Sequence, residues 1–220
     1  MSGALDIIGP TMIGPSSSHT AGACRIGLVA CRLLGEDACR ARVTLYGSFA
    51  KTYRGHGTDR ALAAGIMGMA TDDLRLRDAL DIARERGLDV TFETSADDAG
   101  HPNTARVELE GASGARTEVL GSSVGGGSIL VTEIDGMAVS VTGRRTTFVV
   151  LHRDVPGLIA AVTDVLAEGG ANISDFHLAR VRKGGDAVMC IEVEGPVDPL
   201  TNKRVRRLRD VTNSIVLSPV

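Results

Sequence analysis

The pattern of apolar and polar positions is easier to interpret in the second half of the chain. An apolar, β-branched run over 147–151 is typical of a buried strand, and apolar residues then recur at helical spacing up to Gly169-Gly170. The pattern predicts a βαββαβ order, the ferredoxin-like split unit. Its elements are expected at 147–151, 158–166, 171–181, 187–194, 199–210 and 213–217.

The first half mixes helices and strands without an internal repeat. Helices are expected at 20–34, 58–69 and 71–86, and strands at 41–49, 88–94, 104–110, 116–120, 129–134 and 137–142. Asp135-Gly136 between the last two runs predicts a hairpin. A short polar junction, Gly143-Arg144-Arg145-Thr146, predicts two coupled α+β domains, 1–144 and 145–220.

Composition excludes several classes of protein. The chain has 220 residues, a net charge of −3 and 3% aromatic residues, which argue against a nucleic-acid or anionic-membrane partner and against base stacking. No apolar run reaches the roughly 18 residues of a membrane span. The opening residues, MSGALDIIGP, lack the features of a signal peptide, so we expect a cytoplasmic protein.

The segment GPSSSHTAG (14–22) brings hydroxyls and an imidazole to the start of a helix. A helix N-terminus offers free N–H groups and partial positive charge, which suit a carboxylate or a phosphate. Ser16, Ser17, Ser18 and His19 are therefore candidate ligand-binding residues. The alternative is an ordinary N-cap with spare serines.

A second segment joins Tyr46-Gly47-Ser48-Phe49 to Gly55-His56-Gly57-Thr58-Asp59. A histidine between two glycines is rarely a packing residue, so His56 is a candidate for chemistry, with Thr58 beside it. The alternative is a loop histidine next to a helix cap.

Two weaker segments follow. His101-Pro102-Asn103-Thr104 opens a strand and supplies an imidazole and an amide, although Pro-Asn is also an ordinary turn pair. Gly121–Ser128 contains Ser123 and three consecutive glycines, which form either an anion-binding nest or a flexible turn. Neither segment matches a nucleotide-binding fingerprint.

The cysteines and lysines argue against two cofactors on this chain. The spacing of Cys24, Cys31 and Cys39 fits neither a zinc ribbon nor a usual iron–sulfur run, so we expect no metal site here. Lys51 is the one lysine near the candidate site, but its setting does not resemble that of a pyridoxal phosphate lysine.

The second domain has its own candidate ligand site. His152, Asp154 and Asn172 are expected at one end of the sheet, with a carboxylate on the helix N-terminus and an ammonium on Asp154. The alternative is a capped turn.

Taken in order, GPSSSHT, YGSF with GHGTD, HPN and SVGGG resemble the β chain of bacterial iron–sulfur L-serine dehydratases over essentially the whole chain. The C-terminal part resembles an ACT domain, an amino-acid-sensing module also found in phosphoglycerate dehydrogenases. The length matches the two-chain form of the enzyme, in which a separate α chain holds the [4Fe–4S] cluster. The glycine triplet is followed by Ser128, where the family often has Phe.

The resemblance implies deamination of L-serine to pyruvate and ammonia, an α-chain partner and pairing of ACT domains side by side. It assigns His56, His19 and Tyr46 to the reacting centre, His56 being the first choice for acid–base work. It assigns the remaining candidates to the substrate pocket: Ser16, Ser17, Ser18, Thr58, His101, Asn103 and Ser123. It makes His152, Asp154 and Asn172 the regulatory ligand site.

Two other functions compete with this interpretation. The chain could be a non-catalytic, amino-acid-sensing subunit of another enzyme, which explains the ACT-like half and leaves GPSSSHT and GHGTD unexplained. A stand-alone hydrolase using Ser and His would need a nucleophile-elbow sequence, which the chain lacks.

Overall fold

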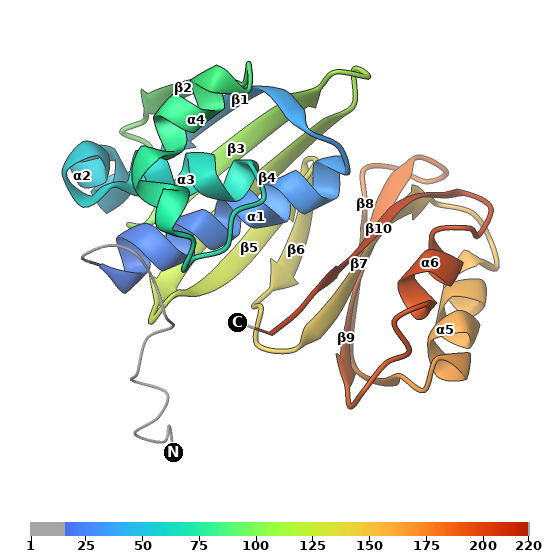
Figure 1. Cartoon of the computed structure of the whole chain (residues 1–220). Coiled ribbons are helices and arrows are strands. Elements are labelled where there is room, and N and C mark those ends of the chain that lie inside the picture. The colour runs from blue at the N-terminus through green and yellow to red at the C-terminus, as the bar shows by residue number, and fades with distance from the viewer. Residues whose placement is uncertain (1–15, 220) are drawn as a thin grey trace. The chain divides into compact units, whose positions relative to one another are not determined.

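The computed structural model describes residues 16–219, and the chain divides into two compact units between Asp135 and Gly136. The first unit is a sheet with helices on one face (Figure 1). Its helices are η2 (Ser17–Gly22, a π-helical turn), α1 (Ala23–Leu34), α2 (Gly47–His56), α3 (Thr58–Ile66), η3 (Leu74–Asp78, a 3-10 turn) and α4 (Ala79–Glu85). Its strands are β1 (Ala38–Leu45), β2 (Asp89–Thr94), β3 (Thr104–Gly111), β4 (Arg116–Gly125) and β5 (Ser128–Ile134).

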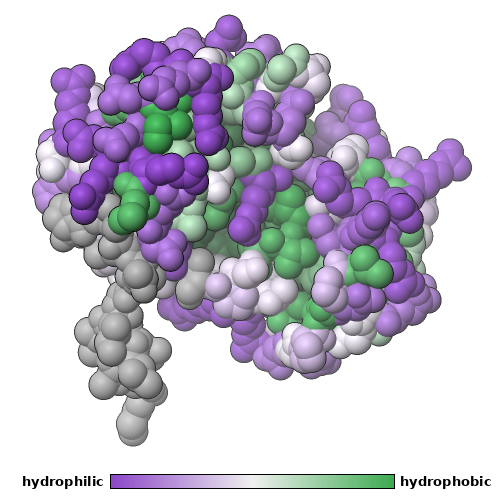
Figure 2. Space-filling model, in the orientation of Figure 1, coloured by the Kyte–Doolittle hydropathy of each residue, from purple (hydrophilic) through white to green (hydrophobic). Residues whose placement is uncertain are grey.

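The sheet of the first unit has the order β2-β1-β3-β4-β5. β1 and β2 are parallel and the other pairs are antiparallel, so a crossover through helices is needed only between β1 and β2. Alternation along β3 buries Ala105, Val107 and Leu109 and leaves Arg106 and Glu108 half-buried on the opposite side. The apolar side faces α1, and the outer surface over α2 and α4 is mostly hydrophilic (Figure 2).

Two glycines let α1 and α3 pack closely. A Cβ on Gly65 would lie 1.9 Å from the Cys24 carbonyl oxygen, and one on Gly27 would lie 2.5 Å from that of Leu62. These helices directly follow the GPSSSHT and GHG segments. The close crossing therefore brings the two sequence motifs into one neighbourhood.

Unit two begins with β6 (Met137–Val141), which the turn at Asp135 and Gly136 connects to its neighbouring strand β5. Both turn residues have positive φ, 50° and 75°, as a type I′ hairpin requires, so the predicted hairpin is confirmed. The boundary that we expected at 144/145 stays a prediction.

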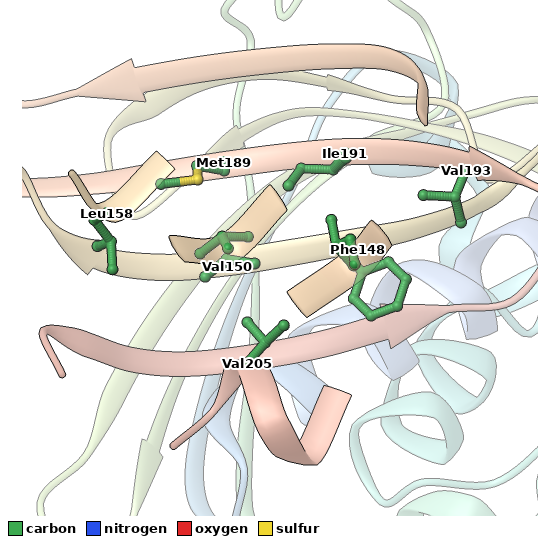
Figure 3. Packing of buried hydrophobic residues seen from close by; sticks show 9 residues of the cluster. Phe148, Val150, Leu158, Met189, Ile191, Val193 and Val205 are labelled. Carbon is green, nitrogen blue, oxygen red and sulfur yellow. The ribbon is translucent and has the colours of Figure 1, made fainter. Parts of the chain in front are cut away.

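The remainder of unit two is a βαββαβ fold, which confirms the predicted fold class. Its elements are β7 (Thr146–Arg153), α5 (Leu158–Glu168), β8 (Asn172–Arg180), β9 (Asp186–Glu194), α6 (Thr201–Val205) and β10 (Val211–Leu217). The strand order is β10-β7-β9-β8. Figure 3 shows apolar side chains of β7 and β9 packed with Leu158 of α5 and Val205 of α6. This unit therefore has a hydrophobic core of its own.

Several predicted bounds are wrong. Residues 46–49, expected to extend a strand, open helix α2, because Gly47 takes φ +53° and turns the chain. The helix expected over 71–86 starts only at Leu74, as a 3-10 turn capped by Asp73, whose carboxylate accepts from the Arg75 N–H. β4 continues to Gly125, beyond the expected end at residue 120. The helix expected over 199–210 is limited to Thr201–Val205.

The described part of the chain, residues 16–219, contains no helix long and apolar enough to cross a membrane.

Candidate functional site

The GPSSSHT and GHG segments meet through two histidines. The ring centroids of His19 and His56 are 4.8 Å apart, and the ring of Phe49 lies edge-on at 5.2 Å from that of His19. His19 belongs to η2, whereas His56 is the last residue of α2, so the alternative of a loop histidine is wrong. His56 is exposed and His19 is half-buried, so the pair has one face toward solvent.

His19 is held through both ring nitrogens. Its Nδ1 lies 3.4 Å from Ser16 Oγ, and its Nε2 lies 3.3 Å from Ser48 Oγ. Burial, and secondly the charge of His56, lower the pKa of His19 from its usual 6.5. The site therefore favours a neutral imidazole at His19.

Three buried hydroxyls of the predicted motifs and their neighbours have no hydrogen-bond partner among residues 16–219. Thr58 and Ser123 are 0% exposed and Thr20 is 2% exposed, and none of their hydroxyl oxygens has a partner in that range. The Asn103 Oδ1 is in the same situation. An unpaired buried polar group costs about 1–3 kcal/mol, so four such groups in the predicted motifs are unusual.

Ser123 lies at a close contact between helix and sheet. A Cβ on Gly22 would lie 2.0 Å from Ser123 Oγ, so only glycine fits at that position of η2. The Ser123 N–H donates to the Asn103 carbonyl oxygen (2.9 Å), which joins two of the predicted pocket residues. Ser17 and Ser18 lie half-buried in η2 beside His19.

The side chain of Tyr46 has a charged neighbour on β3. The phenol hydrogen-bonds Arg106. Although burial disfavours the charged form, hydrogen bonds with Glu133 and Tyr46 raise the pKa of the Arg106 guanidinium. Tyr46 is thus tied to the charged side of β3, while the ring neighbours of His19 come from α2.

The HPN segment fixes the start of α2. The Pro102 carbonyl oxygen accepts from the Ser48 N–H (2.6 Å) and the Phe49 N–H (3.3 Å), satisfying donors at the helix N-terminus. His101 Nδ1 accepts from the Asn103 N–H (3.1 Å). His101 also lines an open cavity of about 720 Å³ between the start of α2 and residues 94–102.

The three glycines of SVGGG form the turn between β4 and β5. Gly125, Gly126 and Gly127 all have positive φ, and Arg25 Nη1 donates to the Gly127 carbonyl oxygen. The turn is therefore held to the first turn of α1 by a half-buried guanidinium.

The cysteines do not fit a cluster. Burial raises the pKa of Cys24 and of Cys190 to about 12, and it raises that of Cys31, so these thiols resist the deprotonation that iron ligation needs. Across residues 16–219, no three or more His, Cys, Asp or Glu side chains are grouped to hold a metal ion. The residues present do not suit an iron–sulfur cluster.

In unit two, the three predicted ligand residues do not meet at one end of the sheet. His152 pairs with Ala187 on β9, but Asn172 pairs with Glu194. Seven residue steps along β9 separate these positions, about 23 Å at ~3.3 Å per residue. The expectation was wrong because β7 and β8 run parallel on either side of β9, so the start of β8 lies beside the start of β7.

His152 and Asp154 differ in whether their polar atoms are free to bind a ligand. His152 is 3% exposed, with Nδ1 2.7 Å from the Arg153 carbonyl oxygen and Nε2 unpartnered within the described residues. Asp154 Oδ2 accepts from the Gly184 N–H (3.0 Å) and from Arg180 (2.7 Å), which lower its pKa. Its charge is thus balanced by Arg180 already.

Comparison with known proteins gives these residues a context. The family model described as serine dehydratase beta chain matches residues 6–85, and that of the ACT domain matches residues 133–210. The chain is 45% identical over 193 residues to the probable L-serine dehydratase beta chain of Bacillus subtilis (strain 168), covering 88% of this chain and 87% of that one. It is 35% identical over 195 residues to the L-serine dehydratase beta chain of Peptoniphilus asaccharolyticus, covering 88% of each.

The chain belongs to the family of L-serine dehydratase beta chains. It carries a C-terminal ACT domain, so the resemblance drawn from the motifs is confirmed. A more distant likeness, 26% identity over 176 residues, relates this beta chain to the D-3-phosphoglycerate dehydrogenase of Synechocystis, covering 78% of this chain and 31% of that one.

Sequence reasoning missed three residues of this beta chain that touch the site. Ser48 contacts His19, Thr20 is buried with an unpaired hydroxyl, and Arg25 holds the glycine turn. Ser48 and Thr20 stood inside motifs that were recognised, but a wrong strand assignment over 46–49 concealed the first. Nothing in the sequence alone signalled the contact of Arg25.

Proposed function

We propose that this chain binds L-serine beside His19 and His56 and takes part in its deamination to pyruvate and ammonia, in assembly with a separate α chain. The observation that carries the proposal is the pair of histidines, 4.8 Å apart, formed by two motifs of the serine dehydratase beta chain. The unpaired hydroxyls of Thr20 and Thr58 support a polar ligand there. The [4Fe–4S] cluster of this proposal lies on the α chain.

In this proposal, the two histidines have different roles. His56 is exposed and accepts the proton from the substrate Cα. His19 stays neutral, held between Ser16 and Ser48, and does not compete for that proton. Ser17 and Ser18 hold the substrate carboxylate at the start of η2, Ser16 orients the His19 ring beside them, and Thr58, His101, Asn103 and Ser123 complete the pocket.

Tyr46 belongs to the proposed site through Arg106. The phenol interacts with Arg106, and Tyr46 stands at the N-cap of α2. We assign Tyr46 to the reacting centre only in the assembled enzyme, where the α chain covers the exposed side of His56. The free thiols suit a reducing, cytoplasmic compartment.

The ACT domain of the proposed enzyme senses an amino acid at a site made by two copies of the chain. In one chain, Asn172 lies too far from His152 for one small ligand to touch both. The other end of β8 carries Arg180, which is ion-paired to Asp154. Antiparallel pairing of two β8 edges would bring Asn172 of one copy to the end of the sheet that carries His152 and Asp154 of the other.

The experiment measures pyruvate release from L-serine under strict anaerobiosis. The chain is assayed alone and mixed with a cluster-bearing α chain. Activity only in the mixture is the expected result. A formed complex with an intact cluster but without activity would favour the second candidate, a non-catalytic amino-acid sensor, which the unpartnered Nε2 of buried His152 also suits.

A further inference from the structure

Two serines from distant parts of the chain hold the His19 ring. Ser16 lies three residues before His19, and its Oγ accepts from the His19 backbone N–H (3.3 Å). The other serine, Ser48, comes from the first turn of α2 and reaches the opposite ring nitrogen. The imidazole is thereby fixed between η2 and α2.

The position of Ser48 is itself closely determined. Gly47 has φ +53°, and a Cβ there would lie 2.6 Å from the Pro102 carbonyl oxygen. That carbonyl oxygen accepts from the Ser48 N–H, and Thr52 Oγ1 donates to the Ser48 carbonyl oxygen (2.8 Å). The backbone of Ser48 is therefore fixed on both sides, and its hydroxyl is left to the histidine.

Each serine hydroxyl can donate to a ring nitrogen of His19 or accept from it, so the two contacts fit either neutral tautomer. Ser16 Oγ accepts from the His19 backbone N–H and keeps a proton that it can donate to Nδ1. With Nδ1 as acceptor, the ring proton lies on Nε2 and is donated to Ser48 Oγ. In this arrangement, both serines stabilise the tautomer that carries its proton on Nε2.

We propose that Ser48 is a positioning residue that holds His19 in the Nε2–H tautomer and keeps its ring beside His56. The inference rests on the proposed function only for its consequence in catalysis. Without the Ser48 hydroxyl, Nε2 loses its acceptor, and the Nδ1–H tautomer and other ring orientations become accessible. His19 would then present a proton acceptor where His56 is meant to act.

The direct test observes the His19 ring by two-bond ¹H–¹⁵N NMR spectra of the full chain at pH 7.5. Wild type is expected to show Nε2–H, Ser48→Ala a mixture of tautomers, and Ser48→Thr the wild-type pattern. Ser113→Ala is the matched control, since its hydroxyl bonds Glu36 in an exposed turn after β3. A dominant Nδ1–H form in wild type, or an unchanged ring in Ser48→Ala, overturns the proposal.

A kinetic test uses the enzyme assembled with its α chain. Ser48→Ala is expected to lower kcat by between about 10- and 100-fold with little change in KM, as for a displaced group, and Ser48→Thr to restore it. A loss that Ser48→Thr does not restore argues against positioning through the hydroxyl. Unchanged turnover in His19→Ala would contradict the role of His19 in the proposed function while leaving the NMR result intact.

Discussion

The rings of His19 and His56 lie 4.8 Å apart and are inclined at 39° to each other. Two protonated imidazoles at this distance repel, so protonation of one disfavours protonation of the other. Burial adds to this effect at His19. Protonation of His19 is therefore disfavoured on two grounds, burial and the neighbouring imidazole.

The first prediction concerns the titration of His19. His56→Gln removes the neighbouring charge, so the pKa of His19 should rise but remain below 6.5, because burial persists. An NMR pH titration of the ring protons measures this pKa. His177→Gln, in the other unit, is the control and should leave it unchanged. Identical titration of His19 in wild type and His56→Gln would contradict the coupling.

The lowered pKa also links stability to pH. The unfolded chain binds a proton at His19 more readily than the folded chain, so the contribution of neutral His19 is complete above about 6.5 and is lost as the pH falls through the folded pKa. Urea unfolding at pH 7.5 and pH 5.5 should therefore show a smaller loss for His19→Gln than for wild type.

The second prediction concerns His56. If its imidazole transfers the substrate proton, His56→Ala should reduce kcat of the assembled enzyme by about 10²-fold or more. His177→Ala removes an exposed imidazole of unit two, whose Nε2 lies 3.1 Å from the Ala138 carbonyl oxygen, and should leave kcat within about twofold. Anaerobic pyruvate assays compare them, and near-normal turnover in His56→Ala would rule out this role.

The third prediction uses two glycines of one helix. Gly47→Ala places a Cβ against the Pro102 backbone at positive φ and should destabilise the chain by at least about 1–2 kcal/mol. Gly55→Ala adds a Cβ with nothing within 4 Å in the last turn of α2 and should stabilise the chain by up to about 0.5–1 kcal/mol. Urea denaturation measures both, and equal effects would mean that the Gly47–Pro102 contact is absent in solution.

The fourth prediction concerns thiol reactivity. Cys24 and Cys190 are buried with pKa values raised to about 12, so they should resist iodoacetamide at pH 7.5. Exposed Cys39 should react. Mass spectrometry of the folded chain locates the labels, and a urea-unfolded sample, in which all four thiols react, is the control. Rapid labelling of Cys24 would show that the η2–α1 region opens readily.

Strong periodicity explains what the sequence could predict. The apolar runs of β7 and β9 and the helical spacing of Leu158, Val162 and Leu166 are buried together in the core of unit two. The Asp135-Gly136 turn requires positive φ, which its residues tolerate. These features depend on local chemistry, so the βαββαβ unit follows from them.

Long-range contacts explain the features that the sequence could not predict. Helix α2 begins at Gly47 because the carbonyl oxygen of Pro102, far along the chain, accepts from its first N–H groups. The residues next to 46–49 in the sequence do not indicate this contact. The same contact places Ser48 within hydrogen-bond distance of His19. The separation of Asn172 from His152 likewise depends on strand order, which periodicity does not encode.

The last prediction tests whether the amino-acid site of the ACT domain needs two copies. Since Asn172 and His152 lie at opposite ends of the sheet, His152→Ala and Asn172→Ala should each abolish binding of L-serine at this site. A mixture of the two variants, unfolded and refolded together, forms mixed pairs with one intact site. Calorimetry on the full chain should then recover roughly a quarter of the sites, as random pairing requires.

The double variant His152→Ala/Asn172→Ala supplies the control for this experiment. Any binding of L-serine that it retains belongs to the first unit and is subtracted. If the mixture recovers nothing although mixed pairs form, the two residues do not share a ligand. A ligand that bonds Nε2 of His152 would lose this hydrogen bond in His152→Ala and bind more weakly. If each single variant binds as wild type does, Nε2 of His152 therefore does not contact an amino acid.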